Sequence, residues 1–303
     1  VNVEGVADVV IGHNNIHDMR SDGITVGEVQ NIVIENNVIR DLLPWRHDEA
    51  RGRGDHPDLI QFWTTNSEAA STGIVIRDNA LIQTRTDGTF FAQGLFMRNP
   101  KAEQDEFGTE FFYRDVTIEG NLIYNSHVNS LVLGEAEGVT IQGNTLIQNT
   151  EAGIKQLTTP IIAVAERSVD VSVTDNIVPG MARDVSVIDN MVTLDEGSAL
   201  GWVVDRNTYT ELQQGADGQV AVGPNGVVVA YDAFLGNLDA ALGQALSGES
   251  LDTPSVPDGA TDQPGHDEGS IDLRGSEATT IPISQPVEDA PSGGSWASET
   301  QSV

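Results

Sequence analysis

The segment Gly138-Val-Thr-Ile-Gln-Gly-Asn144 decides the fold, because its pattern returns along much of the chain. Two apolar residues at alternate positions are followed, after two further residues, by an asparagine. A unit this short cannot bury its own apolar side, so its repetition indicates a solenoid whose units stack on one another. The other copies end at Asn14, Asn37, Asn79, Asn121, Asn176 and Asn190, with a weaker copy at Asn207.

The alternation within each copy predicts a short strand with one side in a core. The asparagine that follows suits a turn, because Asn tolerates the left-handed backbone conformation and bonds its own backbone. Identical amides stacked from coil to coil can also hydrogen-bond along the axis, so we expect an asparagine ladder. Asn14 and Asn37 lie 23 residues apart, as do Asn121 and Asn144, and this spacing is typical of one coil of a three-sided parallel β-helix.

A second set of strands falls between the asparagine strands and supports the same interpretation. Its members are 22–26, 58–62, 93–97 and 129–133, and their residues Ile24, Ile60, Leu95 and Leu131 should stack as one interior column. With this register, the chain resembles the right-handed parallel β-helix superfamily of pectate lyases, polygalacturonases, alginate lyases and mannuronan epimerases. The resemblance covers about residues 1–207, rests on the repeat, and predicts an all-β solenoid.

Three regions follow from the pattern. Residues 1–207 carry the coils, and because the sequence begins inside a repeat, we expect a capping element to precede Val1. Residues 208–247 predict short strands and one amphipathic helix over 230–246 that caps the solenoid. Residues 248–303 are rich in Pro, Gly, Ser and acidic residues, which is typical of a disordered tail or linker.

The composition limits the possible partners. A formal charge of −31 with two lysines argues against nucleic acid, which binds through Lys and Arg. No apolar run is long enough to span a membrane, so we expect no membrane insertion. The absence of Cys excludes disulfides and thiolate metal sites. An acidic, Gly-rich, Cys-free chain is typical of secreted proteins that meet calcium or salt, so we expect an extracellular location, although charge also serves ordinary solubility.

Long loops point to a groove over two of the strands. The intervals from Asn37 to Asn79 and from Asn79 to Asn121 are 42 residues each, which leaves 19 residues beyond a plain coil. Loops on a rigid scaffold are where binding residues concentrate. One loop carries Arg51 and Arg53, which either attract an anionic ligand or pair with neighbouring acids such as Asp55.

Alternation places several polar side chains on the outer surface near this groove. Gln61 and Trp63 face out, Arg98 faces out one coil later, and Glu135 lies on the same outer edge. A polar column stands where the strands begin, with a histidine two residues before it in two coils. Its members are Asp22, Asp58, Gln93 and Asn129, and the histidines are His56 and His127.

The polar column has two interpretations. In the first, the column is a second turn ladder whose side chains hydrogen-bond buried backbone groups, and we favour this interpretation for Asp22 and Asn129. For Asp58 we favour a functional role, because His56 and Asp55 are close in sequence and both flanking turns are lengthened there.

Two family signatures are matched in part. The tetrapeptide Asp55-His56-Pro57-Asp58 resembles the Asp-Pro-His-Asp/Glu signature of mannuronan epimerases in residue types but not in order. The order Asp22, Asp58, His127, Lys155 loosely resembles the Asp/Asp/His/Lys order of polygalacturonases, without their paired aspartates. Catalytic roles therefore do not transfer directly from either family.

Our first hypothesis is an enzyme that abstracts the C5 proton of a uronate in an acidic polysaccharide, as a lyase or an epimerase. The substrate carboxylate must be neutralised, by Arg98, Gln61 or a Ca²⁺ ion held by Asp58 and Asp55. A base must take the proton, and an acid must return one. We assign the base to His56 or His127, the acid to Tyr124 or the other histidine, and substrate binding to Gln61, Trp63, Arg51, Arg53, Gln93 and Glu135.

Two other functions remain open on the same scaffold. A glycoside hydrolase would use two carboxylates, Asp58 with Asp22 or Glu135, whose separation decides the stereochemistry. A non-catalytic adhesin or tailspike-like protein would bind glycan in the groove without turnover.

Overall fold

The computed structural model describes residues 1–44, 57–83, 92–149, 159–179, 191–193, 197–215, 218–222 and 228–230. The expected helix over 230–246 and the expected tail over 248–303 lie outside these ranges, apart from residue 230. Asn190 and the candidate residues Arg51, Arg53, Asp55 and His56 also lie outside them.

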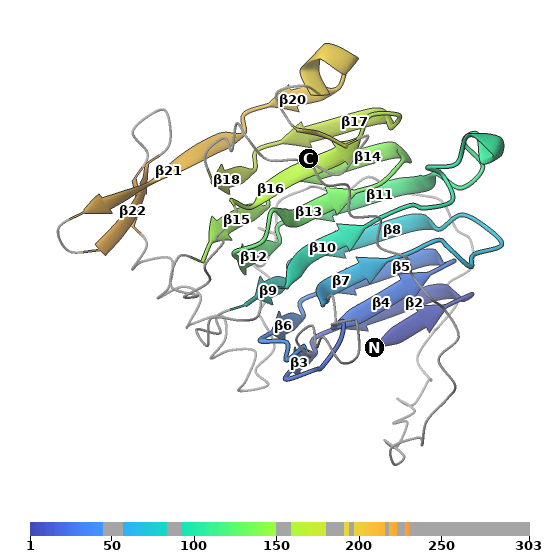
Figure 1. Cartoon of the computed structure of the whole chain (residues 1–303), viewed down its shortest axis with the longest axis horizontal. Coiled ribbons are helices and arrows are strands. Elements are labelled where there is room, and N and C mark those ends of the chain that lie inside the picture. The colour runs from blue at the N-terminus through green and yellow to red at the C-terminus, as the bar shows by residue number, and fades with distance from the viewer. Residues whose placement is uncertain are drawn as a thin grey trace, which may run out of the picture. The chain divides into compact units, whose positions relative to one another are not determined.

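The described strands form three sheets, and each coil adds one strand to each sheet in turn (Figure 1). Sheet A contains β1 (Asn2–Glu4), β4 (Ile24–Gly27), β7 (Asp58–Phe62), β10 (Gln93–Met97), β13 (Asn129–Leu133), β16 (Ile161–Ala165) and β19 (Met191–Thr193). Sheet B contains β2 (Ala7–Gly12), β5 (Gln30–Glu35), β8 (Thr72–Arg77), β11 (Tyr113–Glu119), β14 (Ala136–Gln142), β17 (Val169–Thr174) and β20 (Val203–Asp205).

Sheet C begins with six short strands and ends differently from sheet B. It contains β3 (Asn15–His17), β6 (Val38–Arg40), β9 (Ala80–Ile82), β12 (Leu122–Asn125), β15 (Thr145–Gln148), β18 (Ile177–Pro179), β21 (Thr208–Gly215), β22 (Gly218–Val222) and β23 (Val228–Ala230). Neighbouring strands are parallel, except that β19 runs antiparallel to β16, and β22 runs antiparallel to both β21 and β23. Two three-residue 3₁₀ helices, η1 (Asp105–Phe107) and η2 (Ser198–Leu200), also occur. Within the described ranges, no helix is long and apolar enough to cross a bilayer.

The interior is built from columns of apolar side chains that stack from coil to coil. Ile24 pairs with Ile60, Ile60 with Leu95, and Leu95 with Leu131, and all four side chains are fully buried. This is the interior column that the sequence predicts. Because the core runs along the axis, each coil contributes a few aliphatic groups and depends on its neighbours to cover them.

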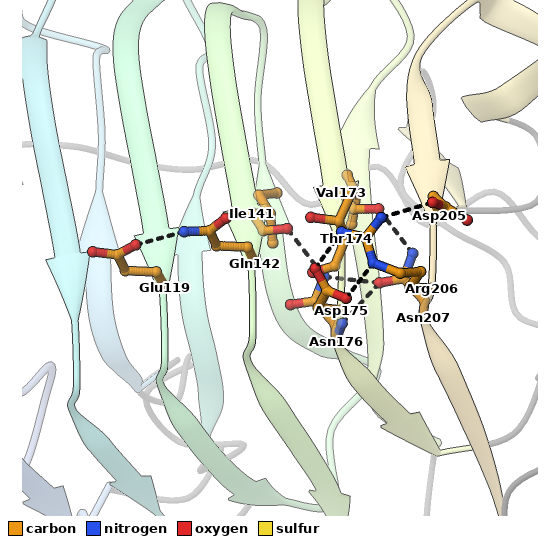
Figure 2. Close-up of polar contacts among 10 residues, drawn as sticks. All are labelled: Glu119, Ile141, Gln142, Val173, Thr174, Asp175, Asn176, Asp205, Arg206 and Asn207. Carbon is orange, nitrogen blue, oxygen red and sulfur yellow. Dashed lines mark hydrogen bonds and ion pairs between the residues drawn. The ribbon is translucent and has the colours of Figure 1, made fainter.

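The asparagine ladder is present and continuous. The Nδ2 of each rung donates to the Oδ1 of the next at 2.9–3.0 Å, and the backbone N–H of each rung donates to the same oxygen. Each interior rung also donates to a strand carbonyl, as Asn176 does to Ile141 (Figure 2). The rungs are Asn14, Asn37, Asn79, Asn121, Asn144, Asn176 and Asn207.

The left-handed backbone residue of this turn is not the asparagine, contrary to the expectation from sequence. In each coil it is the residue before the rung, and its φ lies between 53° and 63°. These residues are His13, Asn36, Asp78, Gly120, Gly143, Asp175 and Arg206. The rung keeps its amide in the ladder, while the preceding residue takes the strained conformation that turns the chain.

Side chains on two of these left-handed residues bond to each other. Arg206 donates from Nε and Nη2 to the two carboxylate oxygens of Asp175, at 2.7 and 2.6 Å, in the adjacent coil (Figure 2). A bidentate pair of this kind is geometrically specific, although its exposure limits its free energy. It aligns the last two turns of the ladder.

An interior rung of the ladder should therefore contribute more to the free energy of unfolding than a terminal rung. We expect Asn79→Ala to lower the free energy of unfolding by about 3 kcal/mol, because the Ile34 carbonyl loses a donor and the buried backbone N–H of Asn37 loses its acceptor. Asn14→Ala makes the same change on an exposed rung and should cost about 1 kcal/mol or less. Urea unfolding followed by circular dichroism measures both. Equal losses in the two variants would contradict this account of the ladder.

Candidate functional site

A polar column crosses four strands on sheet A, where the strands begin. The backbone N–H of Asp58 donates to Asp22 Oδ1 at 2.9 Å. Gln93 Nε2 donates to Asp58 Oδ1 at 2.6 Å, and Asn129 Nδ2 donates to Gln93 Oε1 at 2.5 Å. The four residues thus form one hydrogen-bonded chain, which we call the polar column. It brings together Asp58 and Gln93, two of the residues predicted for the site.

Two glycines allow the column to form at this corner. A Cβ on Gly94 would lie 2.1 Å from the carbonyl oxygen of Ser130, and one on Gly23 would lie 2.6 Å from that of Leu59. Because these contacts are with backbone, no side-chain movement would relieve them. Each glycine follows a column residue, Asp22 or Gln93, so the pattern polar-Gly-apolar marks the position in the sequence.

Asp58 is a fully buried carboxyl group held by two amides. Gln61 Nε2 donates to its Oδ2 at 2.7 Å, while Gln93 holds Oδ1. Burial and, to a smaller extent, the negative charge of Asp22 raise the pKa of Asp58 to about 8, against the opposing effect of the two amide hydrogen bonds. Asp58 therefore carries a proton at neutral pH.

Asp22 is the neighbouring carboxyl group of the same column. It is half-buried, and it accepts the Asp58 N–H at Oδ1 and the hydroxyl of Thr25 at Oδ2, the latter at 3.3 Å. Two ionised carboxylates in adjacent coils would repel each other, and for this reason the charge of Asp22 raises the pKa of Asp58. The arrangement favours one charged and one neutral carboxyl group.

His127 is tied to the end of the polar column through its backbone. The N–H of Asn129 donates to His127 Nδ1 at 3.0 Å. Since Nδ1 is an acceptor, the neutral imidazole carries its proton on Nε2. In this state Nδ1 is occupied by the Asn129 N–H, so this nitrogen does not remove a proton from a substrate.

Arg98 and Trp63 lie at the opposite ends of the same strands. The Arg98 guanidinium stands 5.8 Å from the centroid of the Trp63 ring, and Glu103 accepts from its Nε at 2.8 Å and its Nη2 at 3.0 Å. Asp58 opens β7 and Trp63 follows it, so the two are about 16 Å apart along the strand. The structure therefore does not bring Arg98 together with His127, and its charge is already paired with Glu103.

The remaining two described candidates are buried in other places. Glu135 is 1% exposed, in the turn between β13 and β14 near Arg98, rather than open to the outer edge. Tyr124 is 3% exposed, packs with Ile82 outside the main core, and its hydroxyl donates to Asn149 Oδ1 at 3.2 Å. Tyr124 lies in sheet C, whereas the polar column lies on sheet A.

The described residues do not form a calcium site. Both oxygens of Asp58 accept amide hydrogen bonds, so a cation there would have to displace the donors that hold them. In the part of the chain that the structure describes, no three His, Asp or Glu side chains converge as metal ligands. The second expected ligand, Asp55, lies outside that part, and no catalytic step below depends on a metal ion.

The charge state of Asp58 predicts a pH effect on stability. Its folded pKa of about 8 lies above its ordinary value of 3.8, so the folded chain binds a proton that the unfolded chain has released. The stabilisation is complete below the ordinary value and is lost as pH rises toward the folded pKa. Between about pH 5 and about pH 8, the free energy of unfolding of the wild type should fall, relative to that of Asp58→Asn, by up to about 1.4 kcal/mol per pH unit. Urea unfolding measures both. If the difference in free energy of unfolding between the two proteins stays constant over this pH range, Asp58 is ionised over the whole range.

Comparison with known proteins agrees with this architecture. A family model described as a right handed beta helix region matches residues 1–166. Searches of curated proteins and of solved structures found no match. The matched region is more than half of the 303 residues and contains the strands that carry the polar column. Family model, parallel sheets and asparagine ladder agree, and the chain belongs to the right-handed β-helix family.

Proposed function

We propose that the protein acts on a uronate-containing polysaccharide, bound across the outer face of sheet A, by abstraction of the C5 proton. The observation that supports this most directly is the protonated, buried Asp58 held between Gln61 and Gln93. An acid that keeps its proton at neutral pH is what the second half of such a reaction needs. Because such polymers are found outside cells, an extracellular location belongs to the same proposal.

The reaction needs a base, an acid and neutralisation of the substrate carboxylate. The base removes the proton from C5, and the electron pair moves into the adjacent carboxylate to give an enolate-like intermediate. In a lyase this pair then forms the C4–C5 double bond, the C4–O bond breaks, and an acid protonates the leaving oxygen. In an epimerase an acid returns a proton to C5 from the opposite face. Donors beside the carboxylate stabilise the intermediate in both cases.

The described residues supply the donor half of this scheme. Asp58 delivers the proton from Oδ2 after the half-exposed amide of Gln61 turns from that oxygen to the substrate carboxylate. The base is His56, from the segment outside the described residues, since Nδ1 of His127 already accepts a hydrogen bond. Trp63 and Arg98 contact another part of the polymer, because they lie at the far end of the strands. Arg51 and Arg53 would add positive charge for an anionic chain.

A glycoside hydrolase is the second candidate, and one observation favours it. Asp22 and Asp58 occupy adjacent coils, which are about 4.8 Å apart, and their environments separate an ionised from a neutral carboxyl group. A retaining hydrolase uses two carboxyl groups about 5 Å apart, one as nucleophile and one as acid. The two candidates differ in their products, so one assay separates them.

The test uses the full chain with alginate, pectate, glucuronan and a neutral glycan, with and without chelator. A lyase gives unsaturated products that absorb in the ultraviolet, an epimerase exchanges C5 hydrogen with solvent deuterium, and a hydrolase gives reducing ends alone. We expect one of the first two results on a uronate polymer. Reducing ends alone would favour the hydrolase, and binding without turnover would favour the adhesin.

Asp58→Asn should lower turnover at least about 100-fold, because it removes the acid while keeping the shape of the neutral carboxyl group. Asp115→Asn is the matched control, since Asp115 is exposed on sheet B with a φ of 53° that Asn tolerates. The control should keep wild-type turnover with an unchanged circular dichroism spectrum. Full activity in Asp58→Asn would remove Asp58 from the mechanism.

A further inference from the structure

The connection between β10 and β11, residues 98–112, is fixed to the scaffold on two sides (Figure 1, the green segment with a helical turn). We call it the 98–112 loop. On one side, Thr64 donates to Asn99 Oδ1 at 2.8 Å, and Lys101 Nζ donates to the carbonyl of Ser67. On the other side, Arg167 donates to two loop carbonyls, those of Ala102 at 2.7 Å and Gly108 at 2.9 Å. The loop therefore bridges from the turn after β7 to the turn before β17.

Glu135 lies beneath this bridge. Its backbone carbonyl accepts from Asn99 Nδ2 at 3.1 Å and from the N–H of Tyr113 at 3.0 Å, so the loop rests on the turn that holds it. The side chain is 1% exposed, and its Oε2 has no hydrogen-bond partner among the described residues. An ionised carboxylate in this position would be buried with one donor, its own backbone N–H, and with Oε2 unpaired, which is costly.

The charged groups around Glu135 are all engaged in holding the loop. Arg98 binds Glu103, and Arg167 binds the loop carbonyls and stacks 5.4 Å from the Phe112 ring centroid. Tyr113, the remaining titratable neighbour, donates its hydroxyl proton to the carbonyl of Arg98 at 2.9 Å. Both arginines are thus held by partners on the loop, and neither of them hydrogen-bonds Oε2 of Glu135.

We propose that Glu135 is a proton-controlled latch: with its proton it keeps the 98–112 loop closed, and loss of the proton releases the loop. The loop begins at Arg98, which contacts Trp63 at the edge of the sheet A face. Its release would change the width and charge of that edge. This inference stands on the packing of the loop and does not depend on the proposed enzymatic function.

The direction of the effect follows from linkage. Burial raises the pKa of Glu135 above 4.5, and the charge of Glu103 acts in the same direction, whereas the hydrogen bond from its own backbone N–H and the charges of Arg167 and Arg98 lower it. Opening the loop exposes the carboxyl group to water and returns its pKa toward the ordinary value, so opening releases a proton. Opening therefore becomes more favourable as pH rises above the ordinary pKa of a glutamate, and it stops changing with pH above the raised pKa of the closed state.

Hydrogen exchange measured by mass spectrometry, corrected for the intrinsic rate at each pH, tests the latch in the full chain. From about pH 5 upward, the equilibrium constant for opening, measured at the amides of the loop, should rise by up to about tenfold per pH unit in the wild type. In Glu135→Gln, which carries the shape of the protonated acid without its charge, the loop should stay closed with no such rise. Glu137→Gln is the matched control, because Glu137 is an exposed glutamate two residues along, paired with Arg114 at 3.5 Å. It should behave as the wild type.

Three results would overturn the latch. They are the same pH dependence in Glu135→Gln as in the wild type, an equal rise in amides of the core strand β12, and no rise in the wild type at any pH. The second would show that the whole coil is destabilised rather than the loop. If the glutamine variant does not fold, Glu135→Leu makes the same comparison, because it too has no proton to lose.

Discussion

The hydrogen bond from one asparagine amide to the next is the constraint on which the other columns of the molecule depend. Each rung binds the rung above it and a strand carbonyl, so the vertical register of adjacent coils is fixed at one turn. Side chains alternate across a strand, and a slip of one residue would turn every core residue outward. With the register held, Ile60 stacks between Ile24 and Leu95, and Asp58 comes to lie between Asp22 and Gln93.

The periodic part of the structure could be predicted from sequence, and the irregular part could not. The ladder, the interior column and the polar column recur at constant positions in the repeat, so one-dimensional spacing is enough to find them. The partner of Arg98 is Glu103, five residues along a loop with no repeat, and nothing in the spacing indicates it. The burial of Glu135 cannot be predicted from the spacing either, because the loop that covers it is anchored by Thr64 and Arg167 from distant coils.

The turn illustrates a subtler error. The sequence pattern predicts that asparagine both forms the ladder and takes the left-handed conformation, but the chain divides these roles between two consecutive residues. The protonation of Asp58 is a similar case. Its position could be predicted, whereas its charge depends on complete burial and on the neighbouring carboxyl group, which only the three-dimensional arrangement supplies.

The reversal of strand direction near the C-terminal end of the coils has a consequence for assembly. A parallel solenoid displays an open edge at its last coil, on which another chain could continue the same sheets. Among the described strands, β19 reverses direction on sheet A and β22 does so on sheet C, while the last described strand of sheet B, β20, is parallel. A second molecule docking head-to-tail would find a matching template on one sheet of three, which disfavours fibril growth from this end.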